Sequence, residues 1–431
     1  MNFYDSDRIS DLLKPLGYQK SDVPEDCDLT ILNTCHIREK ASEKMYSDIG
    51  RLAKFKENRK KLGYEMKIIV AGCVAQAEGK EILKRNKAVD IVVGPQNYHI
   101  VPDLIKKSEI KVLANDFPKE SKFDYFPQTK TNNVSSFVTI QEGCDKFCSF
   151  CVVPFTRGAE YSRTVNEIYF ETQNLINSGV REITLLGQNV NAYHGFYECI
   201  KSGQLIQYSL ADLCNKLAEI DGLERIRYIT SHPADMTKEL INEHKTNQKL
   251  MPYLHLPIQS GSNKILKKMN RKYSKEDYMT IVNDIRTKRH DMALTSDFIV
   301  GFPGETDKDF EETLELVKKV KFAGSYSFKY SPRPGTKSSL LNNNINEKIA
   351  DERLKILQLE LNRQQKLFNE SFVSKKLSVL FEKEGKKKYQ YVGRSQYLQP
   401  VHVFANKSVV GKIFDVKIEY SESFSLHGRI C

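Results

Sequence analysis

The sequence lacks any apolar run long enough to cross a membrane. A spanning helix needs roughly 20 consecutive apolar residues, and no stretch of the 431 residues approaches that length. The first residues, Met1–Asp7, also lack the basic and apolar regions of a signal peptide. We therefore expect a soluble cytoplasmic protein with no membrane partner.

Cysteine is scarce and unevenly placed. The nine cysteines are an odd number spread over the whole chain, which is untypical of a secreted domain held together by disulfides. Such a set in a long chain indicates reduced thiols together with metal ligands. The cysteines are Cys27, Cys35, Cys73, Cys144, Cys148, Cys151, Cys199, Cys214 and Cys431.

Three of these thiols form the most informative pattern in the chain. Cys144, Cys148 and Cys151 are spaced by four and then three residues, just after the apolar run Phe137–Ile140. Three clustered thiols can hold three irons of a cubane cluster and leave the fourth iron without a protein ligand. A zinc site would more often add a second Cys pair or a His pair downstream, and none follows. The spacing thus favours a catalytic iron–sulfur site over zinc or inert buried cysteines.

The first hundred residues alternate short apolar runs with helical patterns. This alternation predicts an α/β domain, residues 1–105, with a doubly wound parallel sheet. A helix opens the chain, so the sheet is expected to lack its usual first strand. The expected strands are Leu29–Leu32, Lys67–Ala71 and Ile91–Val93, and the expected helices are Asp5–Leu16 and His36–Lys54.

Two further cysteines follow strands of this first domain. Cys35 and Cys73 come three and two residues after the predicted ends of their strands. The carboxyl ends of parallel strands form the ligand crevice in sheets of this kind. A second metal or cluster site is therefore predicted at this edge.

A second alternating region follows a linker expected at about 95–130. Six strand–helix units over residues 130–365 predict an incomplete (β/α)6 barrel, with its active site at the carboxyl ends of the strands. The expected strands are Phe137–Ile140, Glu182–Leu186, Arg225–Ile229, Tyr253–Leu256, Leu294–Val300 and Tyr326–Tyr330. The expected helices include Val165–Asn177, Leu210–Ile220, Lys275–Thr287 and Lys308–Lys319.

The C-terminal residues 368–431 have short β-like runs that predict a small antiparallel barrel. Residues 371–431 carry nine Lys and two Arg against five acidic residues, a large share of the chain's net charge of +11. Lys386–Lys388 beside Tyr389 and Tyr391 suits electrostatic and stacking contact with RNA. A solvated basic hairpin with no ligand is the alternative.

Four motifs carry a resemblance that covers nearly the whole chain. They are Asn33–Ala41, Val70–Gln76, Gln141–Arg163 and Asp297–Thr306. With these motifs the chain resembles the radical S-adenosylmethionine methylthiotransferases, and among them the MiaB-type tRNA methylthiotransferases. The resemblance implies a radical S-adenosylmethionine core and a C-terminal RNA-binding TRAM domain.

The resemblance also implies two [4Fe–4S] clusters and S-adenosylmethionine as cofactors. Cys144, Cys148 and Cys151 would hold the cluster that binds S-adenosylmethionine and yields a 5′-deoxyadenosyl radical. Cys35 and Cys73 would hold the second cluster with one more cysteine. In the family that cysteine lies in a Gly-Cys-Gln segment just before the part that matches Met1–Ser6. We expect either a start upstream, which we favour, or a second cluster short of one ligand; Cys27 precedes a strand and is a poor substitute.

Polar residues near the predicted strand ends are candidate contacts for S-adenosylmethionine. Each has an alternative role in a turn or as a satisfied core residue. The candidates are Gln188, Asn189 and Asn191 after the second strand, His255, Gln259 and Ser260 near the fourth, and Asp297 in the fifth. Ser231–Pro233 is a rim segment without an assigned role.

Three basic residues near the cysteine motifs have less specific roles. Arg157 and Arg163 could bind phosphate or carboxylate, or form surface ion pairs. His36 is expected to orient the loop at Cys35 rather than to bind iron, and Cys199, Cys214 and Cys431 are expected to be bystanders.

The resemblance implies a reaction and a substrate. The expected enzyme converts N6-isopentenyladenosine at position 37 of tRNA to its 2-methylthio derivative. Its partners would be the anticodon stem–loop of tRNA, an electron donor such as flavodoxin and a sulfur donor, and we expect a monomer. One alternative is a sister enzyme that acts on threonylcarbamoyladenosine or on a ribosomal-protein aspartate. An alternative of another class is a non-catalytic RNA-binding iron–sulfur protein.

Overall fold

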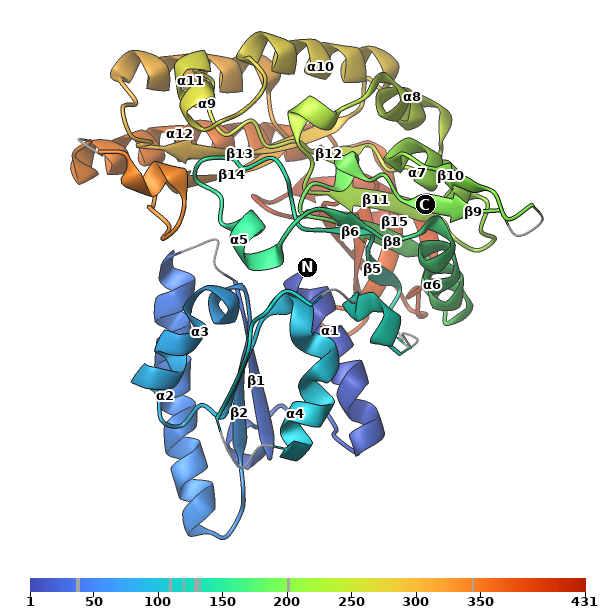
Figure 1. Cartoon of the computed structure of the whole chain (residues 1–431). Helices are drawn as coiled ribbons and strands as arrows, with labels where there is room; N and C mark the ends of the chain where they lie inside the picture. The colour runs from blue at the N-terminus through green and yellow to red at the C-terminus, as the bar shows by residue number, and fades with distance from the viewer. Residues whose placement is uncertain are drawn as a thin grey trace. The chain divides into compact units, whose positions relative to one another are not determined.

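Figure 1 shows the computed structural model of the chain. It describes residues 1–35, 39–107, 111–118, 121–127, 131, 133–199, 202–342 and 345–431. The chain divides into two compact units. The first unit comprises Met1–Thr129, Glu142–Lys146 and Cys151–Glu160, and the second comprises Lys130–Gln141, Phe147–Phe150 and Tyr161–Cys431.

The first unit is built on a four-stranded parallel sheet. Its strands lie in the order β1-β2-β3-β4. In the register of the first pair Leu29 lies opposite Lys67 and Thr34 opposite Gly72, so these two strands end at the same level. The strands are β1 (Leu29–Thr34), β2 (Lys67–Gly72), β3 (Ile91–Val93) and β4 (Val112–Ala114).

Helices cover both faces of this sheet, as Figure 1 shows. Alternate residues of β2 point to opposite faces: Ile68 and Val70 pack with α2 and α3, whereas Ile69 and Ala71 pack with α1 and α4. This two-sided burial confirms the predicted doubly wound fold. The helices are α1 (Asn2–Leu13), α2 (Glu39–Lys61), α3 (Cys73–Arg85) and α4 (Val101–Lys107).

The prediction of a linker at 95–130 was wrong for much of that region, which contains helices and a strand. That region forms η3 (Pro95–Ile100), α4, β4 and η4 (Lys122–Tyr125), and β4 pairs in parallel with β3. The sheet therefore extends beyond the expected domain end at residue 105. A three-residue strand is too short to show a periodic pattern.

Six parallel strands with intervening helices form the core of the second unit. They make two three-stranded sheets, β11-β8-β5 and β12-β13-β14, with a bridge from Ile226 to Leu250 between β11 and β12. The predicted six-strand partial barrel is confirmed. The strands are β5 (Ser135–Thr139), β8 (Glu182–Leu186), β11 (Arg225–Ile229), β12 (Tyr253–His255), β13 (Ala293–Val300) and β14 (Gly324–Lys329).

The helices of this unit match their sequence patterns closely. Thr164, Ser209, Ser274 and Thr306 cap α6, α7, α10 and α11 with reciprocal capping boxes, which fixes where these helices begin. The helices are α6 (Val165–Asn177), α7 (Leu210–Ala218), α8 (Lys238–Thr246), α9 (Asn263–Lys268), α10 (Lys275–Lys288), α11 (Asp307–Val320) and α12 (Glu347–Glu370). The short elements are β6 (Gln141–Glu142), α5 (Val153–Arg157), β7 (Tyr161–Ser162), β9 (Phe196–Glu198) and β10 (Leu205–Gln207).

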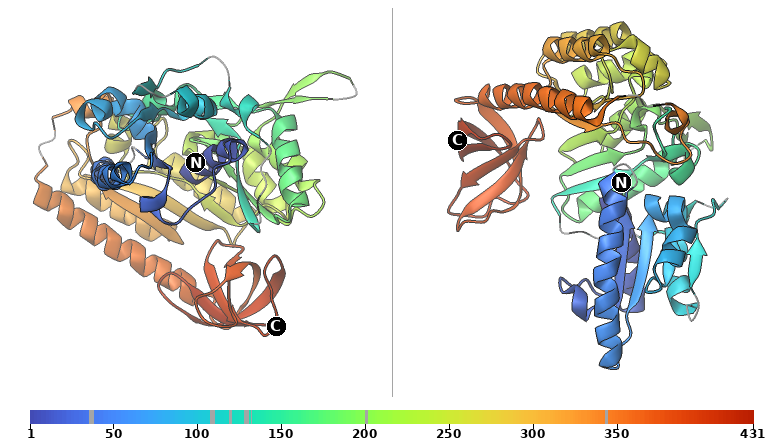
Figure 2. Two further views of the ribbon diagram at one scale, coloured as in Figure 1. Left: turned by 90° about the horizontal axis from the view of Figure 1, so that it is seen from below. Right: turned by 90° about the vertical axis from the view of Figure 1, so that its left-hand side faces the viewer.

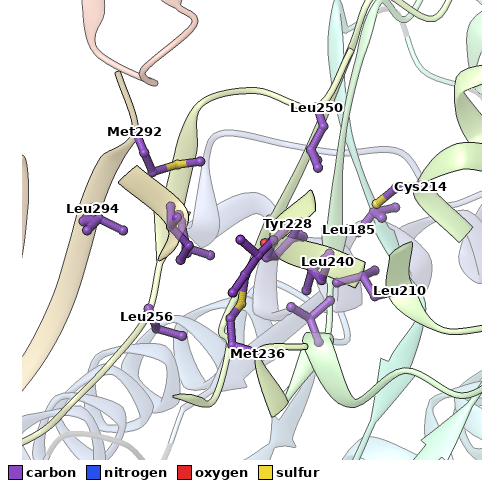
Figure 3. Close-up of a cluster of buried hydrophobic side chains, with 14 of the residues drawn as sticks. Leu185, Leu210, Cys214, Tyr228, Met236, Leu240, Leu250, Leu256, Met292 and Leu294 are labelled. Carbon is purple, nitrogen blue, oxygen red and sulfur yellow. The ribbon is translucent and has the colours of Figure 1, made fainter. Parts of the chain in front are cut away.

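One apolar core joins strands and helices of this partial barrel. Figure 3 shows part of it, with Leu185, Tyr228 and Leu294 from three strands packed among helix residues. Cys214 of α7 is fully buried there. Its place among apolar side chains agrees with its expected role as a bystander. Among the described residues, no helix has both the length and the apolar character of a membrane span.

The C-terminal residues form a closed five-stranded barrel. In Figure 2 the long helix α12 leads directly into it. The strand order is β15-β16-β17-β19-β18, and every pair is antiparallel except the short parallel pair β17–β19. The sequence predicted the barrel but missed its fifth strand. The strands are β15 (Lys376–Glu384), β16 (Gln390–Ser395), β17 (Pro400–Phe404), β18 (Ile413–Ser421) and β19 (Leu426–Ile430).

The barrel also corrects one predicted RNA contact. Tyr391 is 7% exposed and packs in the barrel core, whereas Tyr389 is 54% exposed at the end of the basic hairpin. Along a strand, residues two apart point to the same face, but Tyr389 lies in the turn with a positive φ of 60°. Only Tyr389 of this pair is available for stacking on a base.

Two buried arginines of β11 fasten the barrel to the core of the second unit. Arg225 donates to the backbone oxygens of Ser378 and Arg394 at 3.0 and 2.9 Å. Arg227 donates to the backbone oxygens of Ser395 and Gln396, both at 2.9 Å.

Glu182 of the neighbouring strand β8 balances the buried charge. Its carboxylate lies 3.0 Å from the Arg227 Nε atom and 3.8 Å from an Arg225 nitrogen, and all three side chains are at most 3% exposed. Charged groups out of water are tolerated only when they are paired and hydrogen-bonded. These contacts therefore fix the position of the barrel within the second unit.

We expect Arg227→Met to lower the free energy of unfolding by about 3–5 kcal/mol, because it leaves buried Glu182 poorly compensated. Urea unfolding monitored by fluorescence measures this change. Arg429→Met, which removes a surface ion pair with Glu419, is the control and should cost less than about 1 kcal/mol. Equal small effects of the two substitutions would show that the buried arginines do not hold the barrel.

Candidate functional site

The three clustered cysteines lie in one loop between β6 and α5, which we name the cysteine loop (Cys144–Cys151). Gly143, just before it, has a φ of +73°, and a Cβ atom there would lie 1.9 Å from the Ala159 oxygen. Phe147 inside the loop also has a positive φ, 49°. At position 143, where a side chain would also collide with the Ala159 oxygen, only glycine fits without strain. All three thiols are partly buried, and none is in a disulfide.

The middle of the cysteine loop, Phe147–Phe150, is part of the second unit and is held by contacts within it. Ser149 donates from its backbone N–H to the Met269 oxygen and from its hydroxyl to the Lys268 oxygen, both at 2.9 Å. Arg271 donates from Nη1 to the sulfur of Cys148 at 3.3 Å. Sequence reasoning missed Arg271, because it lies far along the chain from the cysteines and in no recognisable spacing with them.

Buried charges hold the residues that flank the cysteine loop in the first unit. Arg157 donates from Nη2 to Asp5 Oδ2 at 2.6 Å and from Nη1 to Glu142 Oε1 at 2.8 Å. Lys122 donates to the same Glu142 oxygen at 2.8 Å, and Gln96 donates to the other oxygen at 3.2 Å. We name Asp5, Lys122, Glu142 and Arg157 the buried ion network.

The burial of this network corrects the prediction for Arg157. Each of the four charged side chains is at most 3% exposed. Arg157 is therefore neither in a surface ion pair nor free to bind substrate phosphate. Burial alone would raise the pKa of the Asp5 carboxyl, but the charges of Arg157 and Lys122 hold that pKa below its ordinary value.

Arg163, the other arginine of this motif, is also structural. Its Nη1 donates to Glu171 Oε2 at 2.6 Å and to the Thr139 oxygen at 2.7 Å, and the residue is 6% exposed. The guanidinium ties α6 to β5 within the second unit. The ion pair predicted for Arg163 is therefore present, but it is buried and not at the surface.

Cys35 and Cys73 follow β1 and β2 at the carboxyl edge of the first sheet. The two strands end at Thr34 and Gly72, which lie opposite each other in the parallel register, so each cysteine comes one residue after its strand and not three or two as predicted. Gly72 has a φ of 96°, and a Cβ there would lie 2.3 Å from the Thr34 oxygen. The two strands thus approach closely just before the two cysteines.

Cys27 lies before β1, at the opposite end of that strand from Cys35. Its thiol lies 3.2 Å from the Val23 oxygen. This position agrees with its exclusion as a substitute ligand. His36, expected to orient the loop at Cys35, lies outside the described residues.

Within the described parts of the chain, no three His, Cys, Asp or Glu side chains are gathered closely enough to hold a metal ion. The chemistry of the donors nevertheless fits an iron–sulfur cluster. Thiolates are soft ligands that suit such clusters, and none of the three cysteines of the loop is in a disulfide. Hard cations such as magnesium prefer oxygen ligands, and Asp145 supplies the one carboxylate in the sequence of the loop.

Buried polar atoms without partners lie just after β8 and β11. Over the described residues, Asn189 Oδ1 and Ser231 Oγ have no hydrogen-bond partner, although the residues are 1% and 5% exposed. Asn189 donates from Nδ2 to Asp235 Oδ2 at 2.8 Å, which orients its amide. Buried polar groups are rarely left unsatisfied, and a ligand would satisfy them. These atoms fit a polar cofactor such as S-adenosylmethionine.

Asn191 and Gln188 differ from Asn189. The amide of Asn191 is fully used, because it donates to the His232 oxygen at 2.9 Å and accepts from the His232 backbone N–H at 2.8 Å. This pair joins the loops after β8 and β11, so Asn191 has a structural role. Gln188 is half-buried beside Asn189 in the sequence. Ser231, left without a role in the sequence, is the rim residue that sequence reasoning missed.

The structure brings together the candidates around β12 and β13. His255 lies 2.9 Å from Thr295 Oγ1 through Nδ1 and 3.4 Å from Asp297 Oδ2 through Nε2. Gln259 has a positive φ of 77°, and its backbone N–H donates to the backbone oxygen of Asp297 at 2.9 Å. The imidazole and carboxylate are partly exposed and can face a ligand. Ser260 is buried and its hydroxyl lies within hydrogen-bonding reach of Thr313, as expected of a core residue.

Two family models match the chain. Residues 138–317 match the model described as the radical SAM superfamily, which spans five strands of the partial barrel and the cysteine loop. Residues 1–94 match the model described as uncharacterized protein family UPF0004. The radical SAM superfamily implies a [4Fe–4S] cluster and S-adenosylmethionine.

Curated relatives are similar over the whole chain. A tRNA-2-methylthio-N(6)-dimethylallyladenosine synthase of Rickettsia felis is 55% identical over 436 aligned positions, which cover 100% of this chain and 97% of the relative. A protein of the same name from Rickettsia canadensis is 54% identical with the same coverage.

A solved structure shares the fold at low identity. The radical S-adenosylmethionine methyltransferase TsrM of Kitasatospora setae, solved with cobalamin and a [4Fe–4S] cluster, aligns with a TM-score of 0.55 and 12% identity. The alignment covers 78% of this chain and 74% of that chain. At this identity the likeness concerns the fold alone.

The buried ion network predicts a pH-dependent stability. Arg157→Met should lower the free energy of unfolding by about 3–5 kcal/mol near neutral pH, because Asp5 and Glu142 lose their shared partner. The folded-state pKa of Asp5 is depressed, so its contribution is present above its ordinary value of 3.8 and is lost as pH falls below that value. The difference between wild type and variant should therefore shrink in acid.

Chemical unfolding over a pH series measures that difference. Arg51→Met removes an exposed pair with Asp48 and is the control, with an expected loss below about 1 kcal/mol at every pH. A difference for Arg157→Met that stays constant down to pH 3 would contradict the assigned role of the network.

Proposed function

The chain belongs to the tRNA-2-methylthio-N(6)-dimethylallyladenosine synthase family of radical SAM enzymes, and we propose that it carries out that reaction on tRNA. In this reaction a methylthio group is placed on C2 of N6-isopentenyladenosine at position 37, beside the anticodon. The observation that carries the proposal is the 55% identity over 100% of the chain. The match of the radical SAM model to the segment with the cysteine loop supports it.

Cys144, Cys148 and Cys151 are the proposed ligands of the catalytic [4Fe–4S] cluster. When bound, this cluster and S-adenosylmethionine supply a 5′-deoxyadenosyl radical able to remove hydrogen from an unreactive carbon. The protein's residues bind and orient the cofactor. The buried Asn189 Oδ1 and Ser231 Oγ atoms support this role, because they are polar acceptors without a protein partner in the described part of the chain.

His255, Gln259 and Asp297 are proposed as further contacts of S-adenosylmethionine. The 3.4 Å approach of His255 Nε2 to Asp297 Oδ2 supports a shared role, in which the carboxylate orients the imidazole. Gln188 remains a candidate contact. Asn191 would act indirectly, because it holds the loop after β11 and does not contact the cofactor itself.

A second [4Fe–4S] cluster is proposed at Cys35 and Cys73. The common carboxyl edge of β1 and β2 supports this proposal. In the family this cluster takes a third cysteine, and Cys27 lies at the wrong end of β1 to supply it.

The C-terminal barrel, residues 368–431, is proposed to grip the anticodon stem–loop. Lys386–Lys388 supply positive charge for the phosphates, and the exposed Tyr389 ring offers a surface for stacking, with Lys388 Nζ 5.1 Å from its centre. Phe404 of β17 is 61% exposed. It lies opposite Gln390 in the register of β16 and β17, and Gln390 follows Tyr389 in the sequence. A loop nucleotide suits such an enzyme, because its base leaves the stack at little cost.

The remaining partners are proposed from the chemistry. The reaction needs a one-electron donor such as flavodoxin and a source of sulfur. We propose that the enzyme works in the cytoplasm as a monomer, with residues 130–365 as its radical SAM core.

Complementation of a bacterium that lacks this enzyme activity tests the proposed substrate. The gene should restore the 2-methylthio derivative in tRNA nucleosides measured by mass spectrometry, and Cys148→Ala should leave only the isopentenyl precursor. Cys199→Ala, which changes a cysteine just after β9 that is expected to be a bystander, is the control and should restore the product. Methylthiolation of threonylcarbamoyladenosine instead would identify a sister enzyme.

The two cysteine sites should have separable roles. Cys148→Ala should abolish cleavage of S-adenosylmethionine, whereas Cys35→Ala should preserve cleavage and lose methylthiolation. Chromatography of 5′-deoxyadenosine and of the modified nucleoside measures both activities. Equal loss of both activities in the two variants would contradict this division.

A further inference from the structure

Arg271 is a buried cation without an acidic partner. The residue is 8% exposed and lies between α9 and α10 in the second unit. Over the described residues, no Asp or Glu oxygen lies within 4.0 Å of its guanidinium. An arginine stays charged in proteins and can only donate hydrogen bonds. Burial of such a charge is unfavourable unless a negative group compensates it.

The guanidinium is held rigidly by neutral acceptors. Nη2 donates to the Pro257 oxygen at 2.6 Å, and Nε donates to the Tyr273 hydroxyl at 2.7 Å. The Tyr273 hydroxyl in turn donates to the Ile258 oxygen at 3.1 Å. Burial raises the pKa of Tyr273 to about 12, so this phenol stays protonated and is no counter-ion at neutral pH.

The remaining donor points to a sulfur. Nη1 of Arg271 lies 3.3 Å from the Cys148 Sγ atom, and a cysteine that ligates a metal does so as the negatively charged thiolate. Ser149, the next residue, is fastened by its backbone and its hydroxyl to the segment Lys268–Met269 just before Arg271. The guanidinium is thus held by its own acceptors, and the sulfur is held through the neighbouring Ser149, so the contacts around both groups fix the distance between them.

We propose that Arg271 is a positioning residue that compensates the negative charge of the cluster bound at Cys148. Its hydrogen bond stabilises electron density on the sulfur of Cys148, so it favours the one-electron reduced form of the cluster. The electron comes from an external one-electron donor. This inference rests on the proposed function only in that an iron–sulfur cluster is bound by Cys148.

Reduction potentials of full-length variants test the inference. Cys35→Ala with Cys73→Ala in the same chain leaves one cluster site, so that a single potential is followed by electron paramagnetic resonance during a dithionite titration. Arg271→Gln should lower the equilibrium constant for one-electron reduction about tenfold, a shift of about 59 mV to more negative potential. Arg271→Lys, which keeps the charge, should restore at least half of that shift.

Arg286→Gln is the matched control, because its half-buried guanidinium donates to the Val320 oxygen in the same unit. The reduction potential of the cluster in this variant should equal that of the protein with Arg271 and Arg286 unchanged. Loss of the cluster in Arg271→Gln but not in Arg271→Lys would support the same role, since charge is the main difference between them. An unshifted potential in Arg271→Gln, equal shifts in both variants or loss of the cluster in both would overturn it. No iron in any variant would instead contradict the proposed cluster itself.

Discussion

The burial of charge on both sides of the cysteine loop is the constraint on which the site depends. Asp5, Lys122, Glu142 and Arg157 sit out of water in the first unit, and each is held by an oppositely charged neighbour. A buried ion network adds little to stability compared with apolar packing, but it tolerates no displaced partner. It therefore fixes one geometry for the residues before and after the loop.

The second constraint is the parallel sheet. In both units, the candidate residues follow or end strands that run in the same direction, so the topology gathers them without any local sequence signal. Cys35 and Cys73 lie 38 positions apart in the sequence, yet the register of Thr34 with Gly72 brings both strands to a common end. At β8 and β11 the same rule places Asn189 and Ser231, whose oxygens have no partner among the described residues, unlike the amide of Asn191.

Much of this organisation could be predicted from the sequence. The six strand–helix units were predicted because short strand-like runs alternate with helical patterns along residues 130–365. Cys144, Cys148 and Cys151 stood out by spacing alone. In contrast, β4 and β19 are too short or too polar to show a period. The buried states of Arg157 and Tyr391 depend on tertiary contacts, which composition does not reveal. Arg271 is recognisable only once the fold brings it to Cys148.

The central claim is that the cysteine loop binds a [4Fe–4S] cluster with one iron free to take S-adenosylmethionine. Electron–nuclear double resonance of the anaerobic, reduced protein tests this most directly, with S-adenosylmethionine carrying ¹⁵N at its amino group. The account predicts a ¹⁵N coupling to the cluster that disappears in Cys148→Ala. A reduced cluster with no such coupling, or zinc in place of iron, would contradict it.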